Sequence, residues 1–188
     1  MTSRIESTEA IILEQNQRLS ESLLYHQEKE YFEKKGIQAW LEDVPFYITN
    51  NPYMATTYAK LIIHFVRDWI AKHPNAKHHP FYVMELGTGP GCLGFYIVKT
   101  LQTLKKVLKL DDVNIIYVMS DLAKSNLNYH NQHPALQPYI QQGLLDFAVY
   151  DLNQPLPIKL MHSRIELQEK TLINPLILIA NYVFDTIN

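Results

Sequence analysis

The sequence predicts an α/β fold, in which a doubly wound, mainly parallel sheet follows a helical segment at the N-terminus. From Phe81 onward, short apolar runs suited to buried strands alternate with helical patterns, which is typical of a parallel sheet. Glycines occupy every second position after the first of these strands, at Gly87, Gly89 and Gly91. Polar residues stand at the four expected strand ends, namely Glu85, Asp121, Asp151 and Asn181. Ligands of such sheets bind at the carboxyl ends of the strands, so we expect a ligand site there.

The predicted core covers residues 73–188. Its expected strands are Phe81–Leu86, Asn114–Met119, Leu144–Val149 and Leu176–Ala180. Helical periodicity over Leu93–Leu108 predicts a helix directly after the glycine loop, and a second helix is expected to open at Leu122. The glycine loop therefore leads into a helix N-terminus.

Residues 1–72 form the predicted N-terminal helical segment. Apolar residues from Ile5 to about Lys35 recur near one helical face, and Gly36 is typical of a helix end. A connector is expected over Trp40–Asn51, with Asn51 and Pro52 as signals for the start of a second amphipathic helix over Tyr53–Lys72. We expect the first helix to lie on the core or to bind a partner or a second copy.

Composition narrows the class of protein. The chain has 188 residues, with 17 Lys and Arg, 19 Asp and Glu, and a formal net charge of -2. That balance gives no electrostatic basis for binding nucleic acid or a membrane surface. The single cysteine, Cys92, excludes an internal disulfide, and no apolar run reaches the ~20 residues of a membrane span. We therefore expect a cytoplasmic protein.

Glu85 indicates the kind of ligand that the glycine loop would bind. It lies two residues before Gly87, where a carboxylate would repel a phosphate and favour a cationic or hydroxyl-rich ligand. Glycines let the backbone approach such a ligand closely. S-adenosylmethionine carries both a positive charge and a ribose, and is the expected cofactor.

The stretch from about Phe81 to Ile187 resembles the class I S-adenosylmethionine-dependent methyltransferases, in which an acid precedes a Gly-x-Gly-x-Gly loop. The resemblance implies a Rossmann-like sheet and assigns cofactor binding to eight residues: Glu85, Gly87, Thr88, Gly89, Gly91, Asp121, Asp151 and Asn181. Asp121 would accept the ribose hydroxyls, and Asp151 the adenine amino group, with Asp146 as the alternative. Asn181 would line the methionine moiety and the acceptor pocket. Glu85 would hold either the loop or the cofactor's ammonium group.

A narrower similarity is to the MidA-like group, which includes a methyltransferase acting on protein arginine. Asn181 and Asp185 match its Asn-Glu-x-x-Asp segment, whereas Tyr182 replaces the glutamate that would pair with a guanidinium. The segment 46–52 is similar to one that precedes the core in that group, so Phe46, Tyr47, Asn50 and Tyr53 would close over the cofactor. Tyr47, Tyr53, Tyr182 and Asp185 are the candidate acceptor-side residues. The acceptor, a protein side chain or a small molecule, and the general base stay unassigned.

Two other interpretations remain open. Gly89–Gly94 also satisfies Gly-x-Gly-x-x-Gly, so a domain that binds NAD(P) or flavin is an alternative, as is a catalytically silent module. No metal site is expected, and His130 and His133 are expected at the surface. The family's helix, fifth strand and hairpin do not follow Ala180, so we expect a C-terminally incomplete fold with an open sheet edge that could pair with a partner.

Overall fold

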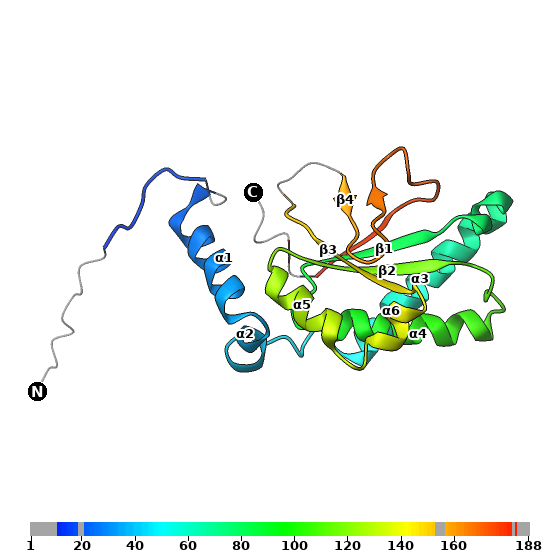
Figure 1. Cartoon of the computed structure of the whole chain (residues 1–188), viewed down its shortest axis with the longest axis horizontal. Coiled ribbons are helices and arrows are strands. Elements are labelled where there is room, and N and C mark those ends of the chain that lie inside the picture. The colour runs from blue at the N-terminus through cyan, green and yellow to red at the C-terminus, as the bar shows by residue number, and fades with distance from the viewer. Residues whose placement is uncertain (1–10, 19–20, 153–156, 182, 184–188) are drawn as a thin grey trace, which may run out of the picture.

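A computed structural model of the chain describes residues 11–18, 21–152, 157–181 and 183. Four parallel strands form one sheet, in the order β3-β2-β1-β6. They are β1 (Phe81–Leu86), β2 (Ile115–Asp121), β3 (Leu145–Val149) and β6 (Ile177–Ala180). All four match the expected strands to within two residues at each end. The α/β class and the parallel sheet are therefore confirmed (Figure 1).

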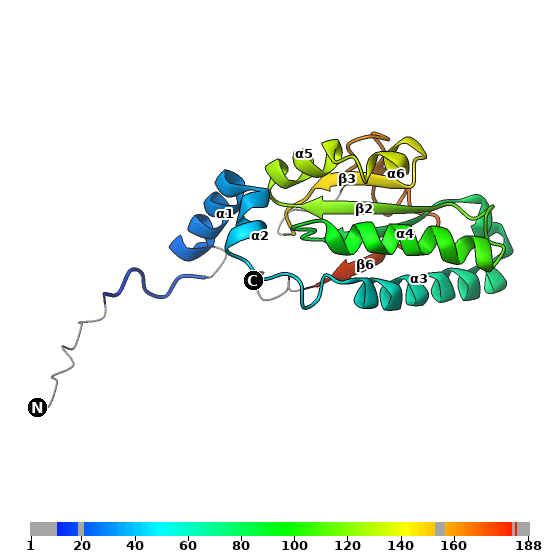
Figure 2. The ribbon, with the colours of Figure 1, turned by 90° about the horizontal axis from the view of Figure 1, so that it is seen from below.

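Four helices cover one face of this sheet (Figure 2). They are α3 (Pro52–Lys72), α4 (Cys92–Val107), α5 (Lys124–Gln132) and α6 (Gln137–Gln141). Phe81 and Val83 of β1 point into the core beneath them, together with Ile63 of α3 and Ile97 of α4. Because α3 packs along α4, it belongs to this layer even though it precedes the sheet in the sequence. A short 3-10 helix, Pro74–His78, joins α3 to the sheet.

The opposite face is covered by a two-stranded antiparallel hairpin, β4 (Ile158–Lys159) and β5 (Glu166–Leu167). Leu167 packs there against Tyr82 and Met84, the residues of β1 that alternate with the helix-facing ones. In the part of the chain that the structure describes, helices therefore cover one face, and the hairpin stands where a doubly wound sheet would carry a helix on the other. Ile158, Leu160 and Leu167 bury the apolar side chains of this face, so it is covered without a helix.

The N-terminal helix is shorter than predicted. It is α1 (Leu23–Lys35), and residues 11–18 before it are not helical, with Asn16 at a φ of 55°. The Ser22 hydroxyl caps α1 by accepting the Tyr25 N–H at 3.1 Å, and Gly36 ends it as expected. A second helix, α2 (Ile37–Glu42), occupies the start of the expected connector. No residue of α1 is buried, so no packing surface holds a longer helix in place.

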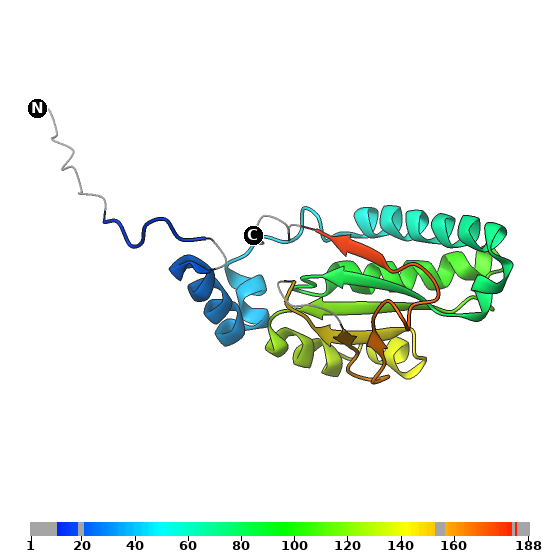
Figure 3. The ribbon, with the colours of Figure 1, turned by 90° about the horizontal axis from the view of Figure 1, so that it is seen from above.

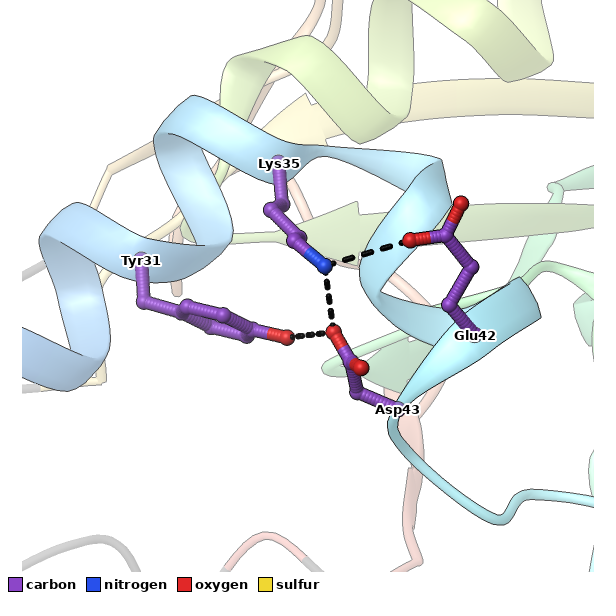
Figure 4. A network of polar contacts seen from close by, with 4 residues as sticks. All are labelled: Tyr31, Lys35, Glu42 and Asp43. Atoms are coloured by element: carbon purple, nitrogen blue, oxygen red, sulfur yellow. Dashed lines mark hydrogen bonds and ion pairs between the residues drawn. The ribbon is translucent and has the colours of Figure 1, made fainter.

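Polar contacts tie α1 to the end of α2 (Figure 4). Lys35 Nζ lies 2.6 Å from Asp43 Oδ2 and 3.2 Å from Glu42 Oε2, and the Tyr31 hydroxyl donates to the same Asp43 oxygen. Both helices lie beyond the carboxyl ends of the strands (Figure 3). The network therefore joins α1 and α2 as one unit beyond the carboxyl ends of the strands.

The edge strand β6 pairs only with β1 among the described residues, as the sequence predicts for an open edge. Leu178 on this strand is 55% exposed. No helix in the described ranges is both long enough and apolar enough to cross a bilayer.

Candidate functional site

A cavity of about 220 Å³ opens at the carboxyl ends of β1, β2 and β3. The core side contributes Gly87, Asp121, Leu122, Ala123, Asn126, Tyr150, Asp151, Leu152 and Val183. The N-terminal unit closes the other side with Tyr25, Glu28, Lys29, Phe32 and Glu33 of α1 and Trp40 of α2. Three residues predicted from different strand ends, Gly87, Asp121 and Asp151, therefore meet in one cavity.

Asp121, the last residue of β2, organises the floor of this cavity. Its Oδ2 accepts the Gly89 N–H at 2.9 Å, and its Oδ1 accepts the Ala123 N–H at 2.9 Å. Asn126 Nδ2 lies 3.5 Å from the same Oδ2. Burial raises the pKa of Asp121, although these hydrogen bonds oppose the shift. The carboxylate thus holds the glycine loop and the start of α5 while one side of it lines the cavity.

Glu85 lies beneath the loop and does not line the cavity. Its Oε2 accepts hydrogen bonds from the Thr88 hydroxyl at 2.9 Å and the Tyr117 hydroxyl at 3.2 Å. Burial raises the pKa of Glu85 to about 7. A Cβ on Gly94 would lie 2.6 Å from this oxygen, so the helix α4 passes directly over the carboxyl group. Of the two roles considered for Glu85, this geometry favours holding the loop.

The glycine loop adopts the left-handed backbone that its glycines predict. The φ angles of Gly87, Gly89 and Gly91 are 62°, 49° and 75°. Its N–H groups bond within the protein: Thr88 donates to the Ser120 carbonyl at 2.8 Å, and Gly91 donates to the Thr88 carbonyl at 2.9 Å. With Gly89 bonded to Asp121, three loop amides are already in use. The loop therefore presents a folded edge to the cavity and not an open row of donors.

His130 is buried, so its expected place at the surface is wrong. Its Nε2 lies 2.8 Å from the Gly89 carbonyl, and a Cβ on Gly91 would lie 2.7 Å from its Cε1. Burial lowers the pKa of His130, so the ring is neutral at pH 7 and Nε2 donates its proton to the carbonyl. His130 follows the buried Leu127 by three positions, which puts both on the inner face of α5. The spacing of His130 from Leu127 could have predicted this burial from the sequence.

A second cavity of similar size lies on the other side of the loop. Gly91, Cys92, His130, His133 and Phe46 are among its lining residues. Burial raises the pKa of the Cys92 thiol, which disfavours its reactive thiolate form. Gly91 and Phe46 therefore lie apart from the cavity that contains Asp121.

Asn181, Tyr47 and Tyr53 line neither cavity. Asn181 Nδ2 is 3.3 Å from Asn50 Oδ1, which brings the connector beside the end of β6. Tyr47 and Tyr53 are 68% and 80% exposed. The connector was expected to close over the cofactor, but α1 closes the Asp121 cavity instead. Tyr182 and Asp185 lie outside the described residues.

Asp146, the alternative adenine contact, has a structural role. Its carboxylate accepts the N–H groups of His162 at 2.8 Å and Ser163 at 3.0 Å, and so anchors the β4–β5 hairpin on β3. Within the described ranges, no group of three or more His, Cys, Asp or Glu side chains is placed to hold a metal ion.

The charged residues around the Asp121 cavity are mainly acidic. Glu28, Glu33, Asp121 and Asp151 contribute four carboxylates, against the single ammonium of Lys29. Such a lining favours a cationic ligand and opposes an anionic one.

Comparisons with known proteins return no match for this chain. No family model, curated protein or solved structure matches it.

Proposed function

We propose that the protein binds S-adenosylmethionine in the cavity between α1 and the strand ends, and transfers its methyl group to an acceptor. The observation that carries this proposal is the meeting of Gly87, Asp121 and Asp151 in one acidic cavity, each from the end of a different parallel strand. The carboxyl ends of adjacent strands are where such sheets bind nucleosides.

The lining residues suit a nucleoside with a positive charge. Asp121 and Asp151 provide acceptors for ribose hydroxyls and an adenine amino group, and Leu122, next to Asp121 in the chain, offers an apolar surface for the base. Gly87 has no side chain to hold the ligand off the loop. The acidic lining would stabilise a sulfonium and an ammonium group.

Two features favour this ligand over a dinucleotide. The amides of Thr88, Gly89 and Gly91 bond within the protein, so they are not aimed at a pyrophosphate. The excess of carboxylates would also repel its phosphates.

The bound cofactor would supply a methyl group on a positively charged sulfur: its C–S bond breaks as an acceptor lone pair forms the new bond, sulfur keeps the electron pair, and the acceptor's proton passes to water. The chain's own residues would position and shield these groups. The cavity of about 220 Å³ is smaller than the roughly 300–1,000 Å³ of most small-molecule sites. A nucleoside would therefore fill it and press against α1, the wall without buried residues.

Titration calorimetry of the full chain with S-adenosylhomocysteine and with NADH tests the cofactor. We expect S-adenosylhomocysteine to bind more tightly, and we expect Asp151→Ala to weaken its binding about tenfold to a hundredfold, as for the loss of a hydrogen bond to a charged group. Asp112→Ala, which removes an exposed acid remote from the cavity, is the matched control and should leave the affinity unchanged. Tighter binding of NADH would overturn the proposal. Binding without methyl transfer to any acceptor would favour the silent module.

A further inference from the structure

Two residues that line this cavity each carry a buried polar atom with no hydrogen-bond partner among the described residues. These atoms are Trp40 Nε1, which is a donor, and Asn126 Oδ1, which is an acceptor. An unpaired buried polar group costs on the order of 1–3 kcal/mol, so native proteins rarely leave such atoms without a ligand, water or side chain. Both residues line the Asp121 cavity.

Asn126 is held rigidly on the core side. It lies in the first turn of α5, is 1% exposed, and its Nδ2 lies 3.5 Å from Asp121 Oδ2. Its Oδ1 faces the junction of α1 and α2, because a Cβ on Gly36 would lie 3.9 Å from that oxygen. The free acceptor therefore points toward the N-terminal unit.

Trp40 reaches the same region from α2. Its ring lies against Gly89, where an added Cβ would come within 2.8 Å of Trp40 Cζ2, and it stacks on Phe32 with ring centroids 5.4 Å apart. These contacts fix the indole plane and hence the direction of its N–H. The donor and the acceptor thus come from two different elements that meet at one cavity.

We propose that Trp40 and Asn126 form a hydroxyl-binding pair, in which one ligand hydroxyl accepts from Trp40 Nε1 and donates to Asn126 Oδ1. A carboxylate or phosphate would satisfy Trp40 but face the Asn126 oxygen with its own lone pairs, and an ammonium group would leave Trp40 unpaired. Only a group that both donates and accepts satisfies the two atoms. This inference rests on the proposed function, under which the group is a ribose hydroxyl of the cofactor.

The Trp40–Asn126 pair and Asp121 would each bind a hydroxyl of the ribose. Each Asp121 oxygen already accepts a backbone N–H, from Gly89 or from Ala123, so part of its capacity is spent on the fold. A second hydroxyl site next to it would let the ribose be held by both diol oxygens. The N-terminal unit would then contribute directly to cofactor specificity.

Calorimetry with S-adenosylhomocysteine and its 2′-deoxy and 3′-deoxy analogues tests the pair in the full chain. For the wild type, we expect one analogue to bind about tenfold more weakly, because it leaves the two buried atoms unpaired. In Trp40→Phe, which keeps an aromatic ring on Gly89 but lacks the N–H, and in Asn126→Ala, the difference between that analogue and the parent should fall below about threefold.

Ser125→Ala is the matched control. The Ser125 hydroxyl is also buried and unpartnered among the described residues and lies near Gly36, yet Ser125 does not line the cavity. This variant should keep the full discrimination of the wild type. The hydroxyl-binding pair would be disproved if the wild type binds S-adenosylhomocysteine but does not distinguish either analogue. Retention of the full difference in Trp40→Phe would disprove it too. In both cases the proposed function would still stand. Absence of any binding would overturn both the pair and the proposed function.

Discussion

The two walls of the Asp121 cavity are held in different ways. On the core wall, Asp121 and the glycine loop are joined by buried hydrogen bonds, and His130 fixes the Gly89 carbonyl from behind. On the other wall, α1 has no buried residue. It faces the cavity with two aromatic rings, Tyr25 and Phe32, and with exposed charges. Buried contacts of the core thus fix the position of the first wall, whereas α1 contacts the core only through partly exposed side chains.

This difference indicates that the core wall of the cavity is preformed and that the α1 wall can adapt to a ligand. Buried hydrogen bonds are costly to break because the separated groups stay desolvated, whereas exposed ion pairs contribute little. The Lys35 network belongs to the second kind and joins α1 to α2, not to the core (Figure 4). We therefore expect the core wall to keep its geometry when α1 and α2 shift to admit a ligand.

The largest effect should come from adding a methyl group to the core wall. In Gly91→Ala, the new Cβ would lie 2.7 Å from His130 Cε1 at a φ of 75°. The left-handed backbone should cost about 1–2 kcal/mol of unfolding free energy, and overpacking against His130 about 1–3 kcal/mol more. Urea denaturation measures the sum of the two losses. Gly143→Ala is the control, because its φ is also positive, at 68°, but no atom lies within 4 Å.

Gly143→Ala should therefore show the backbone cost alone. Equal losses in the two variants would mean that His130 moves aside freely, and the description of the core wall as rigid would be wrong.

A smaller effect should appear in the pH dependence of stability. Burial raises the pKa of Glu85 from 4.5 to about 7, so the folded protein binds a proton at this carboxyl more tightly than the unfolded chain. The contribution of Glu85 to the unfolding free energy should then be fully present below pH 4.5 and fall by roughly 3 kcal/mol as the pH rises through 7.

Glu85→Gln removes this titration while keeping an oxygen that can accept from Thr88 and Tyr117. The difference in unfolding free energy between the wild type and this variant, measured from pH 4 to pH 8, isolates the contribution of Glu85. A difference that does not change with pH would show that the Glu85 carboxyl is not desolvated beneath the loop.

The smallest effect should come from the charges of the α1 wall. Replacing both Glu28 and Glu33 with glutamine should leave the melting temperature unchanged but weaken the binding of S-adenosylmethionine by at most about fivefold, with a loss that fades at high salt. Glu30→Gln is the control, because Glu30 pairs with Lys34 and does not line the cavity. If the double variant lowers thermal stability markedly, α1 is held to the core more firmly than its exposure indicates.

The sequence alone determined the local elements whose signals lie within a few neighbouring residues. The run from Phe81 to Leu86 predicted β1 with its bounds, and the glycines at alternate positions predicted the left-handed turns that follow it. Asn51 predicted the start of α3, where its side chain accepts the Met54 N–H at 3.0 Å. The polar strand ends also predicted that Asp121 and Asp151 would meet, since parallel strands end on the same side.

Only the tertiary structure decided which of those residues face the ligand cavity. Glu85 and Asp121 stand near the ends of adjacent strands, yet Glu85 pairs with Met119, two residues before Asp121, and lies beneath α4, whereas Asp121 lines the cavity. His130 is buried against Gly89, 41 residues earlier in the chain, and Trp40 and Asn126 come from distant elements to line one cavity. Helical periodicity predicted an amphipathic helix from Ile5 to about Lys35, but residues 11–18 are not helical, and α1, which has no buried residue, covers the strand ends. The physical reason is that burial and hydrogen-bond partnership depend on which distant elements pack together, and no local pattern of residues encodes that contact.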